Sequence, residues 1–391
     1  MSKSAFDMFL PTKVLFGEGK ISEIAAQVVR YGSRALLVTT PWNGPQRGDF
    51  EKIKSLLEQG GVTVIVHDQV VPNPTTTLID QGVALAKKEK VHVVIGIGGG
   101  SSIDAAKAIA VGATHPGAPW DYIYTSKLRP DAAKTLPIIA VTTTSGTGSH
   151  VTPYAVFTNT ALETKSTIVD PAVFPKVCIV DPALMINLPK AETAATGFDA
   201  FSHAFESYTN INCNPWIDLL ALEAITKIIQ TLPSVLQDGH DMAARAAMAY
   251  ADTLAGVSIA NVGTTFPHSI GQPISAKFPK VPHGVSLAVV YPEFFRFTWR
   301  TCVPKFATLA RLFNPRWQSA SDLAAAEASV DELIQFQQKI GVHTSLSKLG
   351  VTPDKMESII QDTMACPDTY VTTAVPTEGQ VREMVERMWA N

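Results

Sequence analysis

The chain has 391 residues, of which 46% are hydrophobic and 17% are charged, and its formal net charge is −3. These values are typical of a globular protein of about two or three domains, and they exclude a chain that is disordered, collagen-like or coiled-coil throughout. The small net charge also argues against a generally basic nucleic-acid-binding protein. Because no apolar run reaches the ~18 residues that a membrane span needs, we predict no membrane segment.

The cysteines predict neither a disulfide framework nor a thiolate zinc site, because they lie far apart and form no CxxC pair. They are Cys178, Cys213, Cys302 and Cys366. The first residues lack the basic flank and apolar core of a secretory signal. We therefore predict a reducing, cytoplasmic location.

The first half of the chain alternates short apolar runs with helix-like runs. Strands are predicted at residues 34–40, 62–67, 91–97, 136–142 and 177–180, with helices between them at 50–59 and 77–89. Nearly continuous apolar runs of this length are typical of a mostly parallel sheet that is covered on both faces. The repeated strand–helix–strand order predicts a doubly wound α/β domain.

The second half is rich in Ala and Leu, and its amphipathic periodicity predicts an all-helical domain. Predicted helices cover residues 191–208, 216–232, 242–260, 320–340 and 377–389. The last strand-like run ends shortly before Pro189. We therefore predict one domain over residues 1–188 and a second over 189–391.

A glycine turn joins a predicted strand to a helix within VVIGIGGGSSIDAAKAIA, and it comprises Gly98, Gly99 and Gly100. We expect Ser101 or Ser102 to cap the helix and Asp104 to lie in its first turn. Free N–H groups at such a helix start bind phosphate, so we interpret the turn as a pyrophosphate cradle. The alternative interpretation is a tight βα turn that binds nothing. This alternative is not excluded, because Ser101 replaces the third glycine of the usual dinucleotide-binding fingerprint.

A second polar loop, TTTSGTGSHVTPY, follows the next predicted strand. Its hydroxyl side chains are Thr142, Thr143, Thr144, Ser145, Thr147 and Ser149. Hydroxyls and backbone amides at the carboxyl end of a strand suit a polar ligand in the crevice of an open sheet. A solvated surface loop is the alternative, but two such loops on successive strands favour a ligand.

Four residues suggest a metal site. Asp199 and His203 lie four positions apart and share one face of a predicted helix, although such a pair alone is more often a surface or capping pair. His268 and His283 lie in apolar segments marked by Gly and Pro, where a histidine needs a hydrogen-bond partner or a metal. One carboxylate and three imidazoles suit Fe(II), Zn(II) or another divalent first-row ion.

Together these segments resemble the iron-containing (group III) alcohol dehydrogenase family along most of the chain. The matching stretches are GGGSSIDAAKA, TTTSGTGS, DPALMINLP, TGFDAFSHAFESY and NVGTTFPHSIGQ followed by PHG. The resemblance implies a dinucleotide-binding α/β domain, a helical metal-binding domain and an active site in the cleft between them. It implies that the metal ligands are Asp199, His203, His268 and His283.

The resemblance also implies a set of cofactor-binding residues in the first domain. They are Thr40, Asn73, Gly98, Gly99, Gly100, Ser101, Asp104, Thr142, Thr143, Ser145, Thr147 and Lys165. Three positions depart from the family's pattern. Gln272 stands where many members have a second active-site histidine, and a glutamine cannot titrate. His150 replaces a glutamate, and Thr40 replaces an aspartate that is common in NAD-preferring members.

The function that the resemblance implies is metal-dependent hydride transfer between a small primary alcohol or aldehyde and a nicotinamide. We expect NAD, with some tolerance of NADP because Thr40 carries no charge that repels a 2′-phosphate. We expect Fe(II), with Zn(II) as an alternative, and a homo-oligomer without nucleic-acid or membrane partners. A glycerol-dehydrogenase-like polyol dehydrogenase and a dehydroquinate-synthase-like lyase share this architecture and stay open, as does a non-enzymatic metal- or nucleotide-binding regulator.

Overall fold

The computed structural model describes residues 5–44 and 46–390, which form two compact units. The α/β unit comprises Phe9–Pro189 and Gly239–Ala249. The helical unit comprises the described residues of the remaining segments, 5–8, 190–238 and 250–390. The predicted boundary at residues 188 and 189 stays a prediction.

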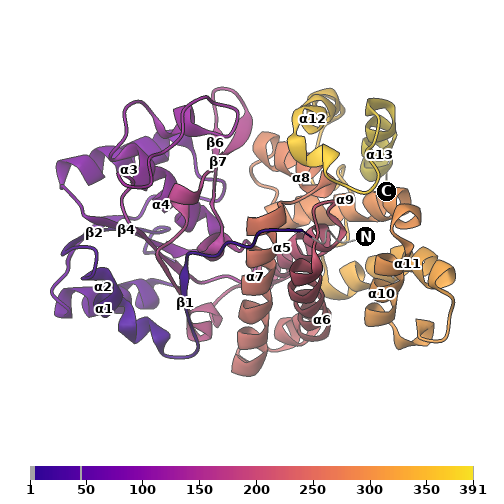
Figure 1. Cartoon of the computed structure of the whole chain (residues 1–391), viewed down its shortest axis with the longest axis horizontal. Coiled ribbons are helices and arrows are strands. Elements are labelled where there is room, and N and C mark those ends of the chain that lie inside the picture. The colour runs from indigo at the N-terminus through magenta and orange to yellow at the C-terminus, as the bar shows by residue number, and fades with distance from the viewer. Residues whose placement is uncertain (1–4, 45, 391) are drawn as a thin grey trace. The chain divides into compact units, whose positions relative to one another are not determined.

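The α/β unit is built on a six-stranded parallel sheet with the order β1-β8-β5-β4-β2-β3 (Figure 1). The strands are β1 (Lys13–Phe16), β2 (Arg34–Val38), β3 (Thr63–His67), β4 (Val93–Gly98), β5 (Ile138–Thr142) and β8 (Val177–Val180). The helices that connect them are α1 (Ile24–Val28), α2 (Arg47–Gln59), α3 (Thr76–Lys88) and α4 (Gly100–Gly112).

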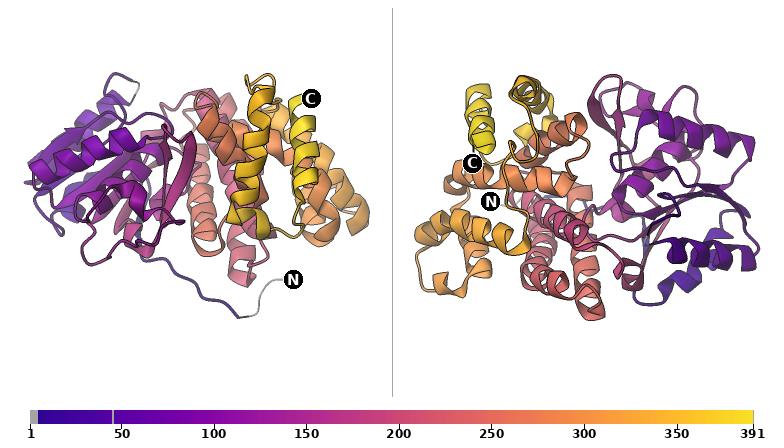
Figure 2. Two further views of the ribbon diagram at one scale, coloured as in Figure 1. Left: turned by 90° about the horizontal axis from the view of Figure 1, so that it is seen from above. Right: turned by 180° about the vertical axis from the view of Figure 1, so that it is seen from behind.

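Helices cover both faces of this sheet, as the right-hand view of Figure 2 shows. Alternate residues of one strand point to opposite faces, so Ala35 and Leu37 pack with Phe50 of α2, whereas Leu36 packs with Ile109 of α4. Every residue of β4 and β5 is buried. The apolar runs that form β4 and β5 are thus central strands without a solvent-facing side, as predicted, whereas the run that forms β3 is a partly exposed edge strand.

A two-stranded antiparallel hairpin follows β5 and was not predicted from the sequence. It consists of β6 (Tyr154–Asn159) and β7 (Thr164–Val169). Phe157 and Ile168 belong to the same buried cluster as the residues of α3 and α4. The hairpin therefore lies on the α3–α4 side of the sheet.

The helical unit contains α5 (Lys190–Thr209), α6 (Pro215–Gln237), α8 (Phe266–Lys277), α9 (His283–Thr298), α10 (Val303–Phe313), α11 (Asp322–Ile340), α12 (Pro353–Ala365) and α13 (Glu378–Ala390). Helix α7 (Met242–Val262) belongs to the α/β unit up to Ala249 and to the helical unit beyond it. The core is aromatic: the rings of Phe205 on α5 and Phe295 on α9 have centroids 4.9 Å apart. The α/β and all-helical architectures are confirmed.

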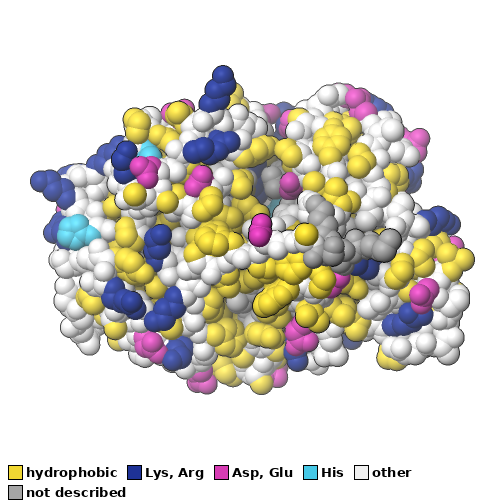
Figure 3. Space-filling view, viewed as in Figure 1, with side chains coloured by type: hydrophobic (Ala, Val, Ile, Leu, Met, Phe, Trp, Pro, Cys, Tyr) yellow, Lys and Arg dark blue, Asp and Glu magenta, His cyan; other side chains and the backbone are white. Residues whose placement is uncertain are grey.

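Among the described helices, α6 alone is long and apolar enough to cross a membrane by length and composition. Its stripe of Ile217, Ala221, Ile225 and Ile228 is buried. Leu232 on the same helix approaches Gly197 of α5. This packing is typical of a core helix of a folded protein. On the face that Figure 3 shows, basic and acidic side chains are intermixed, in keeping with the small net charge.

Candidate metal centre and nucleotide loops

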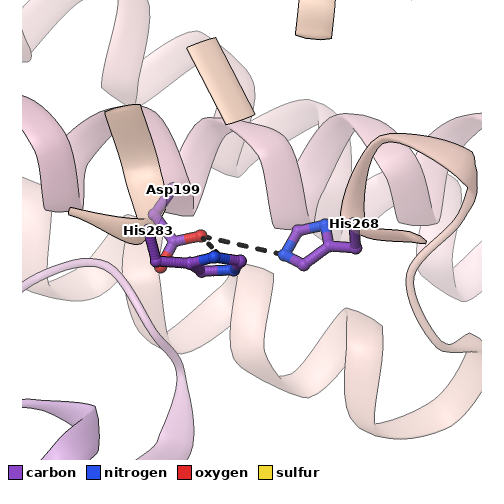
Figure 4. Close-up of side chains that lie close together, drawn as sticks. All are labelled: Asp199, His268 and His283. Atoms are coloured by element: carbon purple, nitrogen blue, oxygen red, sulfur yellow. Dashed lines mark ion pairs between the residues drawn. The ribbon is translucent and has the colours of Figure 1, made fainter. Parts of the chain in front are cut away.

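The helical unit brings the four predicted ligands together. Helix α5 carries Asp199 and His203 one turn apart, while His268 is the third residue of α8 and His283 is the first residue of α9. The Oδ1 atom of Asp199 lies 3.6 Å from Nε2 of His203, 3.8 Å from Nε2 of His268 and 4.0 Å from Nε2 of His283. Figure 4 shows that the His268 and His283 rings both approach the Asp199 carboxylate.

These separations are longer than hydrogen bonds, and they suit donor atoms that surround one ion. Ligand bonds of roughly 2.0–2.2 Å place neighbouring donor atoms roughly 3.3–3.6 Å apart in a tetrahedral site. One donor atom each from Asp199, His268 and His283 lie within 4.8 Å of one another. The His203 ring stacks on that of His268 with a centroid distance of 4.8 Å. The donor set therefore fits a divalent first-row ion.

Two glycines let the three helices approach closely. A Cβ atom on Gly284 would lie 1.9 Å from the carbonyl oxygen of Ala195, so only glycine permits this contact between α9 and α5. A Cβ atom on Gly271 of α8 would lie 2.7 Å from Leu287 of α9. The Ser286 hydroxyl also donates to the Gly271 carbonyl oxygen at 3.0 Å. Glycine thus permits a close backbone approach of α9 to α5 and close side-chain packing of α9 on α8.

A residue that the sequence analysis missed lies behind the ligands. Glu206 is fully buried, and its Oε1 atom lies 2.7 Å from Nδ1 of His268. Burial raises the pKa of Glu206 to about 8, while hydrogen bonds from the Thr265 backbone N–H and the Tyr291 hydroxyl oppose the shift. Its position three residues after His203 was the available signal, because that spacing places it on the same helix face.

The two polar loops of the α/β unit begin side by side. Gly98, at the end of β4, is in register with Thr142, at the end of β5. The N–H of Thr143 donates to the Gly98 carbonyl oxygen at 3.0 Å. Both loops therefore leave the same edge of the sheet, where an open α/β fold holds its ligands.

The glycine turn lets side chains of the second polar loop approach the start of α4. Gly98 has φ of 142°, which side-chain-bearing residues rarely adopt. A Cβ atom on Gly99 would lie 3.1 Å from Thr144, and one on Gly100 would lie 2.7 Å from Thr147. The N–H groups of Gly100 and Ser101 head the helix and have no intrahelical acceptor. This arrangement fits a bound phosphate.

Two expectations about this helix are wrong. Its N-cap is Gly99 and makes no side-chain cap, so neither Ser101 nor Ser102 is the cap. Since α4 begins at Gly100, Asp104 lies beyond its first turn. The Asp104 carboxylate instead accepts a hydrogen bond from the Ser149 hydroxyl at 2.5 Å. It joins the glycine turn's helix to the second polar loop.

Lys107 reinforces this junction and was not predicted. Its fully buried Nζ atom donates to the Ser149 hydroxyl at 2.9 Å and to the Tyr154 carbonyl oxygen at 2.6 Å. Burial lowers the pKa of Lys107 to about 8, and the Asp104 carboxylate, 3.8 Å away, opposes the shift. His150 is fully buried as well; burial and then the charge of Lys107 lower its pKa to about 3.

The remaining predicted cofactor residues also lie in the α/β unit. Lys165 of β7 donates to the Asn73 side chain at 3.0 Å, so these two are neighbours. In the second loop, Ser145 is buried and its hydroxyl contacts the Met185 sulfur at 3.2 Å, while Thr147 is half-buried.

Thr40 lies outside the strand that it was predicted to end, because β2 stops at Val38. It is half-buried in the turn that leads to α2. Arg47, the nearby cation, is bound to Glu51 at 2.7 Å. In the helical unit, Gln272 is half-buried on α8, one turn beyond His268 and on the same helix face.

Two family models match the chain. One, described as iron-containing alcohol dehydrogenase, matches residues 11–182. The other, described as Fe-containing alcohol dehydrogenase family, C-terminal, matches residues 193–389. Together they cover both the parallel sheet and the helices that carry the four candidate ligands.

Curated relatives match over nearly the whole chain. The NAD-dependent methanol dehydrogenase of Bacillus methanolicus is 31% identical over 97% of this chain and 99% of its own length. The 1,3-propanediol dehydrogenase of Klebsiella pneumoniae is 35% identical over 90% of each chain. Among solved structures, an archaeal halo-thermophilic alcohol dehydrogenase from a Red Sea brine pool superposes with a TM-score of 0.93 at 33% identity, over 99% of this chain and 100% of the other. The chain therefore belongs to the iron-containing alcohol dehydrogenase family.

Proposed function

We propose that this enzyme transfers a hydride reversibly between a small primary alcohol, or its aldehyde, and NAD, with one divalent ion held by Asp199, His203, His268 and His283. The observation that carries the proposal is the convergence of three imidazole Nε2 atoms on one oxygen of Asp199, at 3.6–4.0 Å. We propose Fe(II) as the ion in the cell. Zn(II) would bind the same donors and would bind more tightly by the usual affinity order.

When bound, the ion supplies a Lewis acid that polarises the substrate oxygen and favours removal of its proton. The chain's own residues hold the ion and restrict water. Asp199 and His268 are buried, whereas 24% of the His283 side chain is exposed, so the substrate would enter on the His283 side. Gln272 can donate and accept hydrogen bonds but cannot carry a proton, so it would orient the substrate and not relay its proton.

The α/β unit would hold the nucleotide. The N–H groups of Gly100 and Ser101 would receive the pyrophosphate, while Gly98 and Gly99 keep side chains out of its path. Lys165 and Asn73 would contact the ribose and phosphate portion. The nicotinamide, when bound, accepts or donates the hydride, and the protein's part is to fix its position relative to the substrate carbon.

The relatives support an alcohol dehydrogenase over the two alternatives from the same architecture. Curated relatives include dehydrogenases of methanol, choline, 1,3-propanediol and long-chain alcohols. Because these substrates differ widely in size and charge, they favour alcohol oxidation in general and no single alcohol. We also propose a cytoplasmic location. We further propose that the protein is a homo-oligomer, and a measurement of its oligomeric state in solution would test this.

The proposal is tested by elemental analysis of purified protein together with turnover assays on a panel of short alcohols and aldehydes, each with NAD(H) and NADP(H). We expect one divalent ion per chain. His268→Ala should lose the ion and activity but keep nucleotide binding, because the glycine turn does not include the ion's ligands. His240→Ala, at an exposed histidine outside the metal centre, is the control. Full activity in metal-free protein would contradict the proposed site.

A further inference from the structure

A buried carboxylate stands behind the proposed ligands without being one of them. Glu206 has no exposed surface, and its Oε1 atom lies 2.7 Å from Nδ1 of His268. The other ring nitrogen of His268, Nε2, faces Asp199 Oδ1 at 3.8 Å. Glu206 and Asp199 thus lie on opposite sides of the same imidazole ring.

This contact bears on which nitrogen of His268 carries a proton. When Nε2 of His268 binds a divalent ion, the proton of the neutral ring lies on Nδ1, and Nδ1 would donate it to the Glu206 carboxylate 2.7 Å away. The neutral ring then has its lone pair on Nε2, which is the atom that faces Asp199. A metal-binding histidine needs this tautomer, and a carboxylate on its second nitrogen both fixes the tautomer and makes the ring more basic.

The same carboxylate also contacts the other helices of the metal centre. Its Oε2 atom accepts a hydrogen bond from the backbone N–H of Thr265, the N-cap residue of α8, at 2.8 Å. Its Oε1 atom lies 3.1 Å from the hydroxyl of Tyr291, which belongs to α9 and is fully buried. That hydroxyl also lies 3.0 Å from the carbonyl oxygen of Ser202 on α5. One side chain therefore joins all three ligand-bearing helices.

We propose that Glu206 is a positioning residue for the metal centre: it fixes the His268 ring with Nε2 toward Asp199 and, through Thr265 and Tyr291, fixes α8 and α9 against α5. The inference rests on the proposed metal site and concerns how that site is held. Glu206 would contact neither the substrate nor the ion directly, because its carboxylate lies on the Nδ1 side of the His268 ring. If Glu206 only capped α8, its contact with the Thr265 N–H would be sufficient. The additional contact with Nδ1 of His268 links the Glu206 carboxylate to the proposed metal ligands.

Glu206→Gln is the sharpest test because it keeps the size of the side chain and removes its charge. If the amide oxygen of Gln faces His268, its NH₂ group faces the Thr265 N–H, so that two hydrogen-bond donors meet and neither finds an acceptor. If the NH₂ group faces His268 instead, Nδ1 must accept, and the proton moves to Nε2. Both arrangements damage the contact, so we expect Co(II) affinity to fall by about 10–100-fold. Tyr291→Phe should cause a smaller loss.

The measurement is Co(II) affinity of chelator-stripped full-length protein, by competition with a chromophoric chelator, together with the Co(II) visible spectrum. Thr209→Val is the matched control, because this buried hydroxyl on α5 donates only to backbone oxygens one turn earlier. The thermal midpoint of each metal-free variant separates loss of folding stability from loss of the ion. We expect Thr209→Val to bind Co(II) like the wild type and to give the same spectrum.

The possible outcomes separate this inference from the proposed function. Wild-type protein that binds no Co(II) would refute the metal site itself. Wild-type binding with unchanged affinity and spectrum in folded Glu206→Gln would refute only the positioning role, as would an equal loss in Thr209→Val. If Glu206→Gln does not fold, Glu206→Asp decides, because its shorter carboxylate cannot reach His268: unchanged affinity would overturn the proposal, and weakened affinity in a folded variant would support it.

Discussion

Gly99 shows how the absence of one side chain can matter to a binding site. Its φ of −78° is ordinary, so the position does not need glycine for its backbone conformation, in contrast to Gly98. What it needs is space, because a Cβ atom there would lie 3.1 Å from Thr144. The sequence predicted the loop, but only the structure separates these two reasons for glycine.

We expect Gly99→Val to raise the KM for the nicotinamide cofactor by about tenfold or more, equivalent to about 1.4 kcal/mol of lost binding. The branched side chain would fill the space above the start of α4 and keep the pyrophosphate away from its N–H groups. Gly99→Ala should have a smaller effect. Steady-state kinetics provide the measurement, and Gly379→Val, at a glycine of α13 with no atom near its Cβ position, is the control. An unchanged KM in folded Gly99→Val would remove this turn from the cofactor site.

The expected tolerance of NADP beside NAD depends on Thr40, which carries no negative charge. A carboxylate at this position would repel a 2′-phosphate, and Arg47 is already bound to Glu51 at the surface. Thr40→Asp should therefore lower kcat/KM for NADP by about tenfold more than for NAD. Thr40→Asn, which adds no charge, is the matched control. Equal losses with both cofactors in the Asp variant would show that Thr40 does not face the ribose.

The four candidate ligands were predicted as a set, and the structure brings them together, yet their support was only partly predictable. Asp199 and His203 share a helix, so their spacing was informative. The contact between Glu206 and His268 joins residues 62 positions apart, and periodicity on one helix does not reveal a partner on another. Lys107 was missed for the same reason, since its acceptors Ser149 and Tyr154 lie 42 and 47 positions away.

At the scale of elements, the buried parallel strands were the most predictable feature. Each central strand is a continuous apolar run, which has few other uses in a folded chain. The β6–β7 hairpin was missed because its strands mix polar and apolar residues, and partly buried positions lie between the buried ones. Helices α8 and α9 were not among the predicted helices; each contains a proline, Pro273 and Pro292 respectively, and an internal proline usually indicates that a helix ends.

The contact between α5 and α9 leads to a prediction about an element junction. Gly284→Ala would place a Cβ atom 1.9 Å from the Ala195 carbonyl oxygen, and backbone cannot rotate aside as a side chain can. We expect α9 to shift, at a cost of about 1–3 kcal/mol in folding stability. His283 would move with the helix, so metal affinity should fall as well.

The urea midpoint and the Co(II) affinity of Gly284→Ala would be measured beside those of Gly379→Ala, where an added methyl group meets nothing. Wild-type values for both quantities in Gly284→Ala would mean that α9 does not approach α5 as closely as described. A lower midpoint with normal affinity would confine the glycine's role to packing.

For the molecule as a whole, the prediction of family, fold and class of enzyme from the sequence is confirmed by the family models and by the solved structures. This was possible because several motifs occur in the right order along most of the chain. The substrate could not be predicted in the same way. Relatives with similar sequence identity to this chain are dehydrogenases of alcohols of very different size and charge. Small differences in side chains decide the substrate, and motif spacing does not encode them.

His150 makes the stability of the whole protein depend on acid pH. Its pKa is about 3 in the folded protein, against an ordinary value of 6.5, because burial and the charge of Lys107 disfavour the imidazolium. Below pH 6.5 the His150 imidazole therefore binds a proton in the unfolded chain, whereas in the folded protein it stays neutral until the pH approaches 3. This contribution to stability is complete above pH 6.5 and is lost as the pH falls toward 3, by at most about 1.4 kcal/mol per pH unit.

His150→Gln lacks this titration, so the stability of the wild type relative to the variant should decline between pH 6.5 and pH 4. Urea midpoints of both proteins across this range provide the measurement, and other titrating groups cancel in the difference. A difference that does not change with pH would show that His150 can become charged inside the folded protein.

The position of β1 has a consequence for how the protein is made. This first strand pairs with β8, the last strand of the sheet, and Thr12 next to it donates to the Pro175 carbonyl oxygen across 163 positions. At ribosomal rates of about 5–20 residues per second, β1 waits roughly 8–33 s before its partner is synthesised. The backbone groups of β1 lack their partner strand throughout that interval, and once β5 has been synthesised its edge that later receives β8 is unpaired as well. The nascent chain is therefore most prone to aggregate before β8 leaves the ribosome, and a chaperone that covers the growing sheet would act in that period.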